Sequence, residues 1–255
     1  MVRPFPGCFG VQSMKAIILS AGQGSRLLPL TEGRPKCLLP IGPRTLIEWQ
    51  IWALTQGGVD DIAVVVGYHA RDVQDLLKRL EGPKLKIRTI FNPFYKLADN
   101  LASCWMARHE MDRDFVILNG DTVIEPSIFQ KLLASPAAPI TVTIDKKESY
   151  DSDDMKVHLK GEKLLDIGKT LPPERTDGES IGMLLFRGEG PKLFTHYLDD
   201  IMHTPEGLKW WYLRAIGQIA ERANVMTCNI EGLGWGEVDF PADLERVSKL
   251  VEGWA

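Results

Sequence analysis

The sequence is poor in cysteine and has no excess of basic residues. Its four cysteines are scattered and form no Cys-x-x-Cys pair: Cys8, Cys37, Cys104 and Cys228. This spacing argues against a disulfide framework and a cysteine-ligated zinc site, and it suits a reducing cytoplasm. The net charge of -4 argues against general affinity for nucleic acid or membrane surfaces, because either would usually leave a basic excess. Any anion-binding site must therefore be a local feature.

Long hydrophobic runs are also missing. No apolar run approaches the roughly 18 to 20 residues that a membrane-spanning helix needs, and residues 1–13 lack the apolar centre of a signal peptide. We expect these residues to be an N-terminal extension, with Met14 as the functional start of a cytoplasmic protein. With 44% hydrophobic residues among 255, the chain can bury a full core, which favours one α/β domain over residues 14–255.

What the sequence does contain is a strand that runs into a loop of small residues. Residues 16–25 join a short apolar run, typical of a buried parallel strand, to a cluster that allows a sharp turn. Gly22 and Gly24 leave room for a bulky anion, so that loop amides can point at phosphate oxygens. Arg26 and Lys36 bring cationic groups to the same place. Gly-x-Gly alone is a weak signal, but the whole stretch predicts a polyphosphate site.

Two common phosphate-binding motifs do not fit this stretch. It lacks the Gly-Lys-Ser/Thr of a Walker loop, and Leu27 stands where the dinucleotide-binding motif has its third glycine. An NAD-dependent oxidoreductase would also want an acidic residue at the end of the second strand. Gly67 and Tyr68 stand there instead, which argues against that class.

The rest of the chain alternates between helices and strands. Helical spacing predicts helices over residues 45–56, 68–80, 100–111, 191–197 and 208–223, and a last helix from Pro241. Apolar runs predict strands over residues 62–66, 84–91, 114–118, 139–147, 156–165 and 225–231. This alternation predicts an α/β fold with a Rossmann-like, mostly parallel sheet flanked by helices. Its ligands should lie beyond the carboxyl ends of the strands, where the glycine loop also lies.

A carboxylate follows the strand at residues 114–118. Asn119, Gly120 and Asp121 come directly after it, and an acidic side chain there is placed to hold a divalent cation that carries a triphosphate. Taken alone, an Asn-Gly-Asp sequence fits a solvated turn equally well. Beside the glycine loop, the metal-binding interpretation is favoured.

The segments Ala21–Thr31 and Pro35–Pro40 resemble the signature of nucleotidyltransferases that act on sugar phosphates and related phosphates. The resemblance continues through most of the chain and implies a GT-A-like fold with a small acceptor-side insertion. Residues 14–135 would mainly bind the nucleotide, and residues 136–235 would mainly bind the acceptor. It implies a nucleotide site formed by Leu19, Ala21, Gly22, Gly24, Ser25, Asn100 and Ser103, with Asp99 as a further candidate to read the base. Capping of a helix explains Asp99 or Asn100 as well.

The same resemblance implies a magnesium site and an acceptor site. Asp121 and Asp239 would hold Mg2+, and Glu237, two residues earlier on a strand, would face the same side as Asp239. Lys169 would align the acceptor phosphate, although an exposed loop lysine explains it equally well. Glu179 and Gly182 would lie beside the acceptor.

A group of aromatic residues allows a further interpretation. Trp210, Trp211 and Tyr212 are consecutive, and such rings can enclose a quaternary ammonium group. Aromatic residues at helical spacing more often belong to the core, so the core interpretation is favoured.

The chemistry that the resemblance implies is transfer of a nucleotide with release of pyrophosphate. Arg26, Lys36 and Lys169 would be the catalytic cations, because an acceptor phosphate is already an anion and needs mainly positioning and charge neutralisation. Residues 100–103 and 237–239 resemble small cytidylyltransferases that act on phosphocholine, aminoethylphosphonate or inositol 1-phosphate. The expected partners are therefore CTP and a small phosphorylated acceptor, and a homodimer stays open. The alternatives are a hexose 1-phosphate enzyme that uses UTP, dTTP or GTP, and a non-catalytic nucleotide-binding regulatory module.

Overall fold

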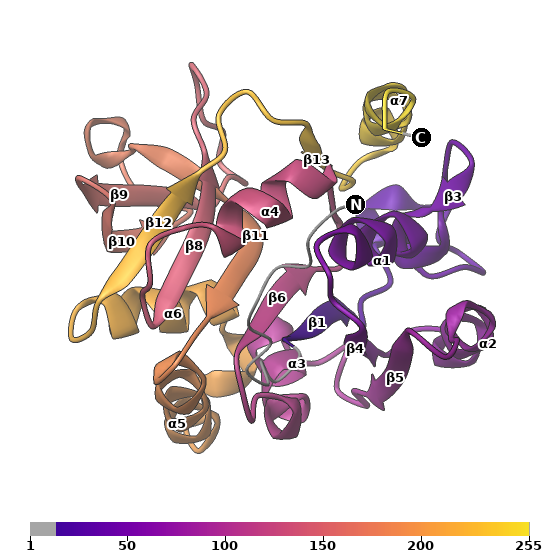
Figure 1. The fold of residues 1–255 in the computed structure, drawn as a ribbon, viewed down its shortest axis with the longest axis horizontal. Helices are drawn as coiled ribbons and strands as arrows, with labels where there is room; N and C mark the ends of the chain where they lie inside the picture. The colour runs from indigo at the N-terminus through magenta and orange to yellow at the C-terminus, as the bar shows by residue number, and fades with distance from the viewer. Residues whose placement is uncertain (1–13, 255) are drawn as a thin grey trace, which may run out of the picture.

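A single large sheet runs through the chain in the computed structural model, which describes residues 14–254. The expected N-terminal extension, residues 1–13, lies outside the described residues. Within them the sheet has nine strands, in the order β5 (Lys86–Phe91), β4 (Asp61–Val66), β1 (Lys15–Ser20), β6 (Phe115–Asn119), β11 (Gly178–Phe186), β8 (Ile140–Asp145), β12 (Val225–Asn229), β10 (Lys163–Gly168) and β9 (Lys156–Lys160). Figure 1 shows β5 to β6 on one side of the molecule and β8 to β12 on the other.

The two sides of the sheet differ in strand direction. β5, β4, β1 and β6 are parallel to one another, as the alternation of helices and strands predicts. β11 runs antiparallel to β6 and β8, and β10 runs antiparallel to β9 and β12. The α/β fold is confirmed, but the sheet as a whole is mixed. The reason is that the described chain has no α-helix between β8 and β11, and parallel neighbours need a long crossover connection.

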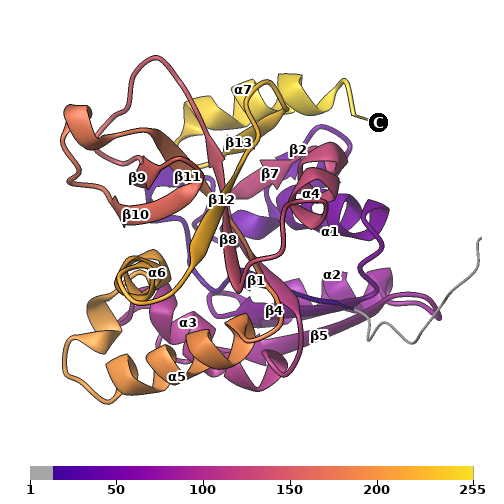
Figure 2. The ribbon, with the colours of Figure 1, turned by 60° about the vertical axis from the view of Figure 1, so that its left-hand side comes forward.

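Helices cover both faces of the sheet (Figures 1 and 2). One face packs against α1 (Leu46–Gln56), α2 (Ala70–Leu80) and α4 (Pro126–Leu133), and the other packs against α3 (Asn100–Met106), α5 (Gly190–Met202) and α6 (Tyr212–Ala220). β1 serves both faces, because Ala16 and Ile18 join the first cluster while Ile17 and Leu19 join the second. β1 is therefore buried along its whole length, which explains the apolar run of residues 16–19 between Lys15 and Ser20.

A third, smaller hydrophobic cluster packs the last helix against residues 27–49. It joins α1 to α7 (Pro241–Val251) and to the segment that contains the short strands β2 (Pro40–Ile41) and β3 (Arg44–Thr45). Next to it, β13 (Trp235–Glu237) pairs antiparallel with β7 (Thr122–Ile124). In this way the C-terminal segment reaches the carboxyl end of β6, where the candidate site lies.

The helix expected over residues 208–223 is interrupted in the structure. A short 3₁₀ turn, Gly207–Lys209, is followed by extended residues, and α6 begins at Tyr212. The main chain of this segment accepts hydrogen bonds at Leu208 and Trp210 from the backbone at the start of α3, and the Tyr212 N–H donates to Asn100 Oδ1 at 3.0 Å. These tertiary contacts use backbone groups that a continuous helix would have paired internally.

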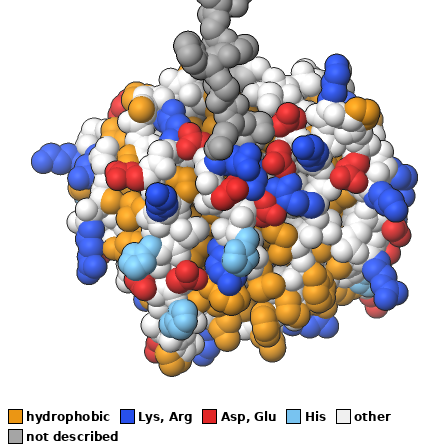
Figure 3. All heavy atoms as spheres, turned by 60° about the horizontal axis from the view of Figure 1, so that its bottom comes forward, with side chains coloured by type: hydrophobic (Ala, Val, Ile, Leu, Met, Phe, Trp, Pro, Cys, Tyr) orange, Lys and Arg blue, Asp and Glu red, His pale blue; other side chains and the backbone are white. Residues whose placement is uncertain are grey.

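The surface carries charges of both signs. On the face drawn in Figure 3, Lys and Arg side chains are interspersed with Asp and Glu, and hydrophobic side chains gather in the lower part. Among residues 14–254, no helix combines the length and the apolar character that crossing a membrane requires.

Candidate nucleotide and acceptor site

The two glycines of the loop after β1 differ in the space around them: Gly22 has free space beside it and Gly24 is tightly packed. A Cβ at Gly22 would meet nothing within 4 Å, whereas a Cβ at Gly24 would lie 2.9 Å from the Cβ of Lys36. Gly24 also has a φ of 76°, which favours glycine, and its carbonyl accepts a hydrogen bond from Thr31 Oγ1 at 2.9 Å. Gly24 thus allows the segment of Lys36 to pack against the loop, while Gly22 leaves space above it.

Lys36 is the centre of the candidate site. Its Nζ lies 3.1 Å from Asp121 Oδ2 and 2.7 Å from Asp239 Oδ1, although these residues are far apart in the sequence. Burial alone would lower the pKa of Lys36, but attraction to Asp121 and Asp239 outweighs it and raises the pKa above its ordinary value. Lys36 is therefore an ammonium group held between two carboxylates.

The backbone brings Asp121 and Asp239 together. The Val238 N–H donates to the Asp121 carbonyl at 3.1 Å, which extends the pairing of β13 with β7 by one step. At Gly120, a Cβ would lie only 2.3 Å from the Leu19 carbonyl oxygen, so the turn that carries Asp121 rests directly on the end of β1. Both carboxylates are therefore placed by main-chain contacts.

Two neighbouring hollows border this centre. One, of about 180 Å³, is lined by the glycine loop and the turn after β6: Leu19, Ser20, Gly22, Gly24, Lys36, Cys37, Gly120 and Asp121. The other, of about 230 Å³, extends toward the second half of the sheet and includes Arg26, Asn100, Asn119, Asp121, Lys169, Glu179, Trp211, Glu237 and Asp239 among its lining residues. The structure thus places most of the predicted site residues around one continuous region.

Several of the predicted nucleotide-binding residues have other partners. Ala21 is buried, and its carbonyl accepts the Tyr68 N–H. Ser25 is exposed and begins a 3₁₀ turn, Ser25–Leu27. Asn100 accepts the Tyr212 N–H but still borders the second hollow, whereas Ser103 is buried and its Oγ accepts from Asn92 Nδ2 at 3.0 Å. A direct role of Ser103 toward the base stays a prediction.

Asp99 occupies the N-cap position of α3, the alternative that its sequence context leaves open. Its side chain makes no capping hydrogen bond. Asp99 therefore lies where a capping residue would lie, but it does not cap the helix.

The side of the site that is predicted to bind the acceptor has charged side chains on loops. Asp153, in the connection between β8 and β9, pairs with Arg26 at 3.1 Å and with Lys169 at 3.1 Å. Arg26 also lies 3.6 Å from Asp239, and the Lys169 ammonium lies 4.8 Å from the centre of the Trp211 ring. Arg26 and Lys169, two of the predicted catalytic cations, are therefore linked through Asp153. The sequence did not predict a role for this aspartate. Nothing in the motif singled out Asp153, which belongs to a polar run without helix or strand periodicity.

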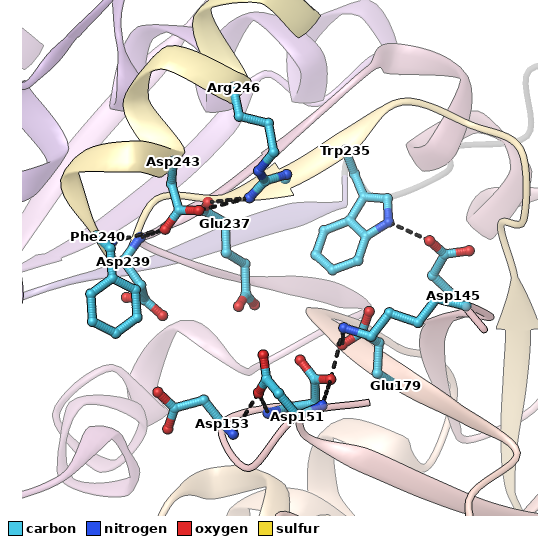
Figure 4. Close-up of a pocket in the computed structure, with 13 residues that line it drawn as sticks. Asp145, Asp151, Asp153, Glu179, Trp235, Glu237, Asp239, Phe240, Asp243 and Arg246 are labelled. Atoms are coloured by element: carbon cyan, nitrogen blue, oxygen red, sulfur yellow. Dashed lines mark hydrogen bonds and ion pairs between the residues drawn. The ribbon is translucent and has the colours of Figure 1, made fainter. Parts of the chain in front are cut away.

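Acidic side chains line the adjoining pocket of about 400 Å³ (Figure 4). In Figure 4 Glu237 points into this pocket from β13, and Glu179 lies across it. Burial and then the charges of Asp121 and Asp239 raise the pKa of Glu237 well above its ordinary value. Burial raises the pKa of Glu179 to about 7 against the opposing effect of Lys147, which lies 3.0 Å away. The pocket holds carboxyl groups whose protonation depends on their neighbours.

Gly182 has a packing role in the structure. Its φ is 73°, and a Cβ there would lie 2.3 Å from Asn119 Nδ2, so β11 can approach the end of β6 only with glycine at this position. A role of Gly182 beside the acceptor stays a prediction.

The three consecutive aromatic residues do not form a cage. Tyr212 is completely buried in the core, and Trp210 is stacked under Arg214 at 3.9 Å. Trp211 alone of the three borders the second hollow, which agrees with the favoured core interpretation for most of the group.

The side chains present fit a magnesium ion that arrives with a triphosphate. Among residues 14–254, no group of three or more His, Cys, Asp and Glu side chains is arranged to hold a metal by itself. Mg2+ commonly uses one or two carboxylates together with substrate phosphates, and Asp121 and Asp239 offer that pair beside the open glycine loop. Glu237 lies next to them without completing a three-ligand group.

Comparisons with known proteins agree with this geometry. Over 251 residues, the chain is 29% identical to the bifunctional IPC transferase and DIPP synthase of Rubrobacter xylanophilus. This match covers 96% of this chain and 54% of the Rubrobacter protein. The chain is 27% identical over 256 residues to the CTP:phosphoglutamine cytidylyltransferase of Campylobacter jejuni. This match covers 91% of this chain and 98% of the Campylobacter protein. The chain thus spans about half the length of the Rubrobacter protein and nearly all of the Campylobacter protein.

Solved structures share the fold. The inositol-1-phosphate CTP transferase from T. maritima superimposes with a TM-score of 0.79 at 19% identity, covering 97% of this chain and 100% of that chain. A family model described as nucleotidyl transferase matches residues 15–153, the segment that runs from β1 through the turn of Asp121 to Asp153. Because this match extends over more than half of the chain, the chain belongs to the nucleotidyl transferase family.

Proposed function

We propose that this protein is a magnesium-dependent cytidylyltransferase that transfers CMP from CTP to a small phosphorylated or phosphonate acceptor. The observation that carries the proposal is the position of Lys36 between Asp121 and Asp239, at the foot of an open glycine loop. Cationic and metal-binding groups gathered around phosphate-sized space are what nucleotidyl transfer requires.

In the proposed reaction an oxygen of the acceptor phosphate attacks the α-phosphorus of the nucleotide. The bond from that phosphorus to the bridging oxygen breaks, and pyrophosphate leaves with the electron pair. The attacking oxygen carries no proton at neutral pH, so the protein needs no strong general base. This agrees with a site built from cations and carboxylates.

The chain's own residues would divide the work. Amides around Gly22 and Gly24 would hold the phosphates, Lys36 and Arg26 would neutralise charge on the departing pyrophosphate, and Lys169 would orient the acceptor phosphate. When bound at Asp121 and Asp239, magnesium supplies further positive charge to the phosphate oxygens. Arg26 and Lys169 must exchange their contact with Asp153 for substrate anions.

The choice of CTP is supported by the relatives, because both the Campylobacter protein and the T. maritima structure carry CTP in their names. A hexose 1-phosphate enzyme is the alternative, and the shared fold alone does not separate the two.

The test is pyrophosphate release with magnesium, using each NTP and dTTP against phosphocholine, aminoethylphosphonate, inositol 1-phosphate, glycerol phosphate and several hexose 1-phosphates. Turnover with CTP and a non-hexose acceptor is the expected result. Release with UTP, dTTP or GTP and a hexose 1-phosphate would instead support the alternative. Nucleotide binding without turnover across the panel would favour a regulatory module.

A further inference from the structure

Gln50 is a polar residue on the buried face of α1. Its side chain is completely buried in a helix that otherwise turns apolar residues toward the sheet. Its Nε2 donates to the Asn119 carbonyl at 2.6 Å and to the Thr122 carbonyl at 2.8 Å. These two carbonyls flank Gly120 and Asp121, so one amide group fastens both ends of the turn to the helix.

A buried amide is costly unless it is hydrogen-bonded. At Gln50 both N–H donors are used, and both are used on the turn that carries Asp121. An apolar residue would suit the surrounding core better, because Ile47 and Ile51 on the same helix belong to a hydrophobic cluster. The amide therefore contributes hydrogen bonds to the turn, and the packing of α1 does not require it.

Two further contacts complete this support. Thr122 Oγ1 donates to the Ile181 carbonyl at 3.0 Å, which ties the turn to β11. The Val238 N–H donates to the Asp121 carbonyl at 3.1 Å, which ties the turn to the segment of Asp239. Asp121 is thus held from the helix, from the sheet and from the segment that carries the second carboxylate.

We propose that Gln50 is a positioning residue that fixes Asp121 relative to Asp239 and Lys36, and thereby sets the affinity of the site for a divalent cation. The inference rests on the proposed function, because the metal site belongs to that reaction. Residues that hold metal ligands in place typically change metal affinity or activity by 10- to 100-fold when they are replaced. Loss of the Gln50 amide would remove the hydrogen bonds that the Asn119 and Thr122 carbonyls accept from it and let the turn move.

The experiment compares Gln50→Met, which keeps the length of the side chain but removes both donors, with the wild-type protein. Free Mn2+ is titrated with each protein and followed by electron paramagnetic resonance, below the unfolding temperature of the variant. The melting temperature, kcat and the KM of the acceptor are measured in parallel. We expect Mn2+ binding to weaken roughly 10- to 100-fold and kcat to fall, with little change in the acceptor KM.

Thr122→Val provides a second, milder variant, and Thr227→Val is its matched control. Each loses one hydroxyl that donates to a main-chain carbonyl, from Thr122 to Ile181 and from Thr227 to Glu162 at 2.9 Å. The Thr122 hydroxyl also lies 3.5 Å from Asp121 Oδ1, whereas Thr227 is on β12. We expect Thr122→Val to weaken Mn2+ binding roughly fivefold and Thr227→Val to leave it unchanged. Should Gln50→Met fail to fold, this pair decides the question.

Wild-type Mn2+ affinity in a folded Gln50→Met, or in Thr122→Val when Gln50→Met does not fold, would overturn the positioning role. Equal losses in Thr122→Val and Thr227→Val would overturn it too, because they would indicate a general effect of stability. A wild-type protein that binds no Mn2+ and releases no pyrophosphate would overturn the proposed function as well. The two failures are therefore distinguishable by the behaviour of the wild-type chain.

Discussion

Asp121 and Asp153 border the same hollow, but they are held there in different ways. Asp121 sits on a turn whose main chain accepts hydrogen bonds from the Gln50 side chain and the Val238 N–H, and the turn rests on β1. Asp153 lies on the connection between β8 and β9 with about half of its side chain exposed, and it is tied to the site through Arg26 and Lys169. The turn on the proposed nucleotide side is thus held by hydrogen bonds to its main chain, whereas the charged side chains on the proposed acceptor side are held by exchangeable ion pairs.

This contrast indicates which side responds to ligands. Exposed ion pairs contribute little to stability, usually below about 1 kcal/mol, so a phosphate group can replace Asp153 beside Arg26 and Lys169 at small cost. The turn of Asp121 has no comparable freedom. We expect the acceptor side to rearrange on binding and the nucleotide side to remain as it is.

The largest effect should come from the fixed side. Asp121→Asn removes a proposed metal ligand, and the loss of several kcal/mol of charge stabilisation should reduce kcat by about 10³-fold or more. The melting temperature should change little, since Lys36 keeps Asp239 as a partner. Steady-state pyrophosphate release and thermal unfolding test both parts, with the exposed Asp75→Asn on α2 as control. Near-normal activity in Asp121→Asn would remove Asp121 from the metal site.

A pair of glycine substitutions separates binding from folding. Gly22→Ala places a methyl group in open space, so the melting temperature should stay the same while the KM of the nucleotide rises roughly tenfold, as a lost charged hydrogen bond would require. Gly120→Ala drives a Cβ toward the Leu19 carbonyl and should destabilise the fold by about 1–3 kcal/mol. Equal melting temperatures in the two variants would contradict the packing described at Gly120.

A smaller effect is expected on the exchangeable side. Asp153→Asn weakens the contacts that hold Arg26 and Lys169, so substrate phosphates no longer compete with a carboxylate for them. The KM of the acceptor, through Lys169, and that of the nucleotide, through Arg26, should each fall by no more than about fivefold, the equivalent of one surface ion pair, and kcat should remain near the wild-type value. A large rise in KM would mean that Asp153 contacts the substrate instead of competing with it.

The smallest effect concerns pH. The pKa of Glu179 is raised to about 7 in the folded protein, so the folded state binds this proton more tightly than the unfolded chain does. Its contribution to stability therefore decreases as the pH rises from about 4.5 through about 7. Glu179→Gln should gain a few degrees of melting temperature relative to wild type between pH 5 and pH 8. A constant difference over that range would contradict the raised pKa.

The same contrast explains what the sequence could predict. The glycine spacing with Arg26 and Lys36 in one stretch, and Asp121 directly after an apolar run, are local patterns that a single segment of the sequence displays. The interrupted helix before Tyr212 and the role of Asp153 depend on contacts with distant segments, and no local pattern encodes them. Gln50 was equally hidden, because a single polar residue in an amphipathic helix acquires meaning only when its two carbonyl partners are known.

The position of Lys36 also bears on how the site comes into being. Two carboxylates brought together by strand pairing would repel each other, and the ammonium group between them removes most of that repulsion. The protein can therefore fold with the proposed catalytic centre already assembled, without a metal ion as a template. Under the proposed function, magnesium availability would limit the rate of the reaction but not the amount of folded protein in the cell.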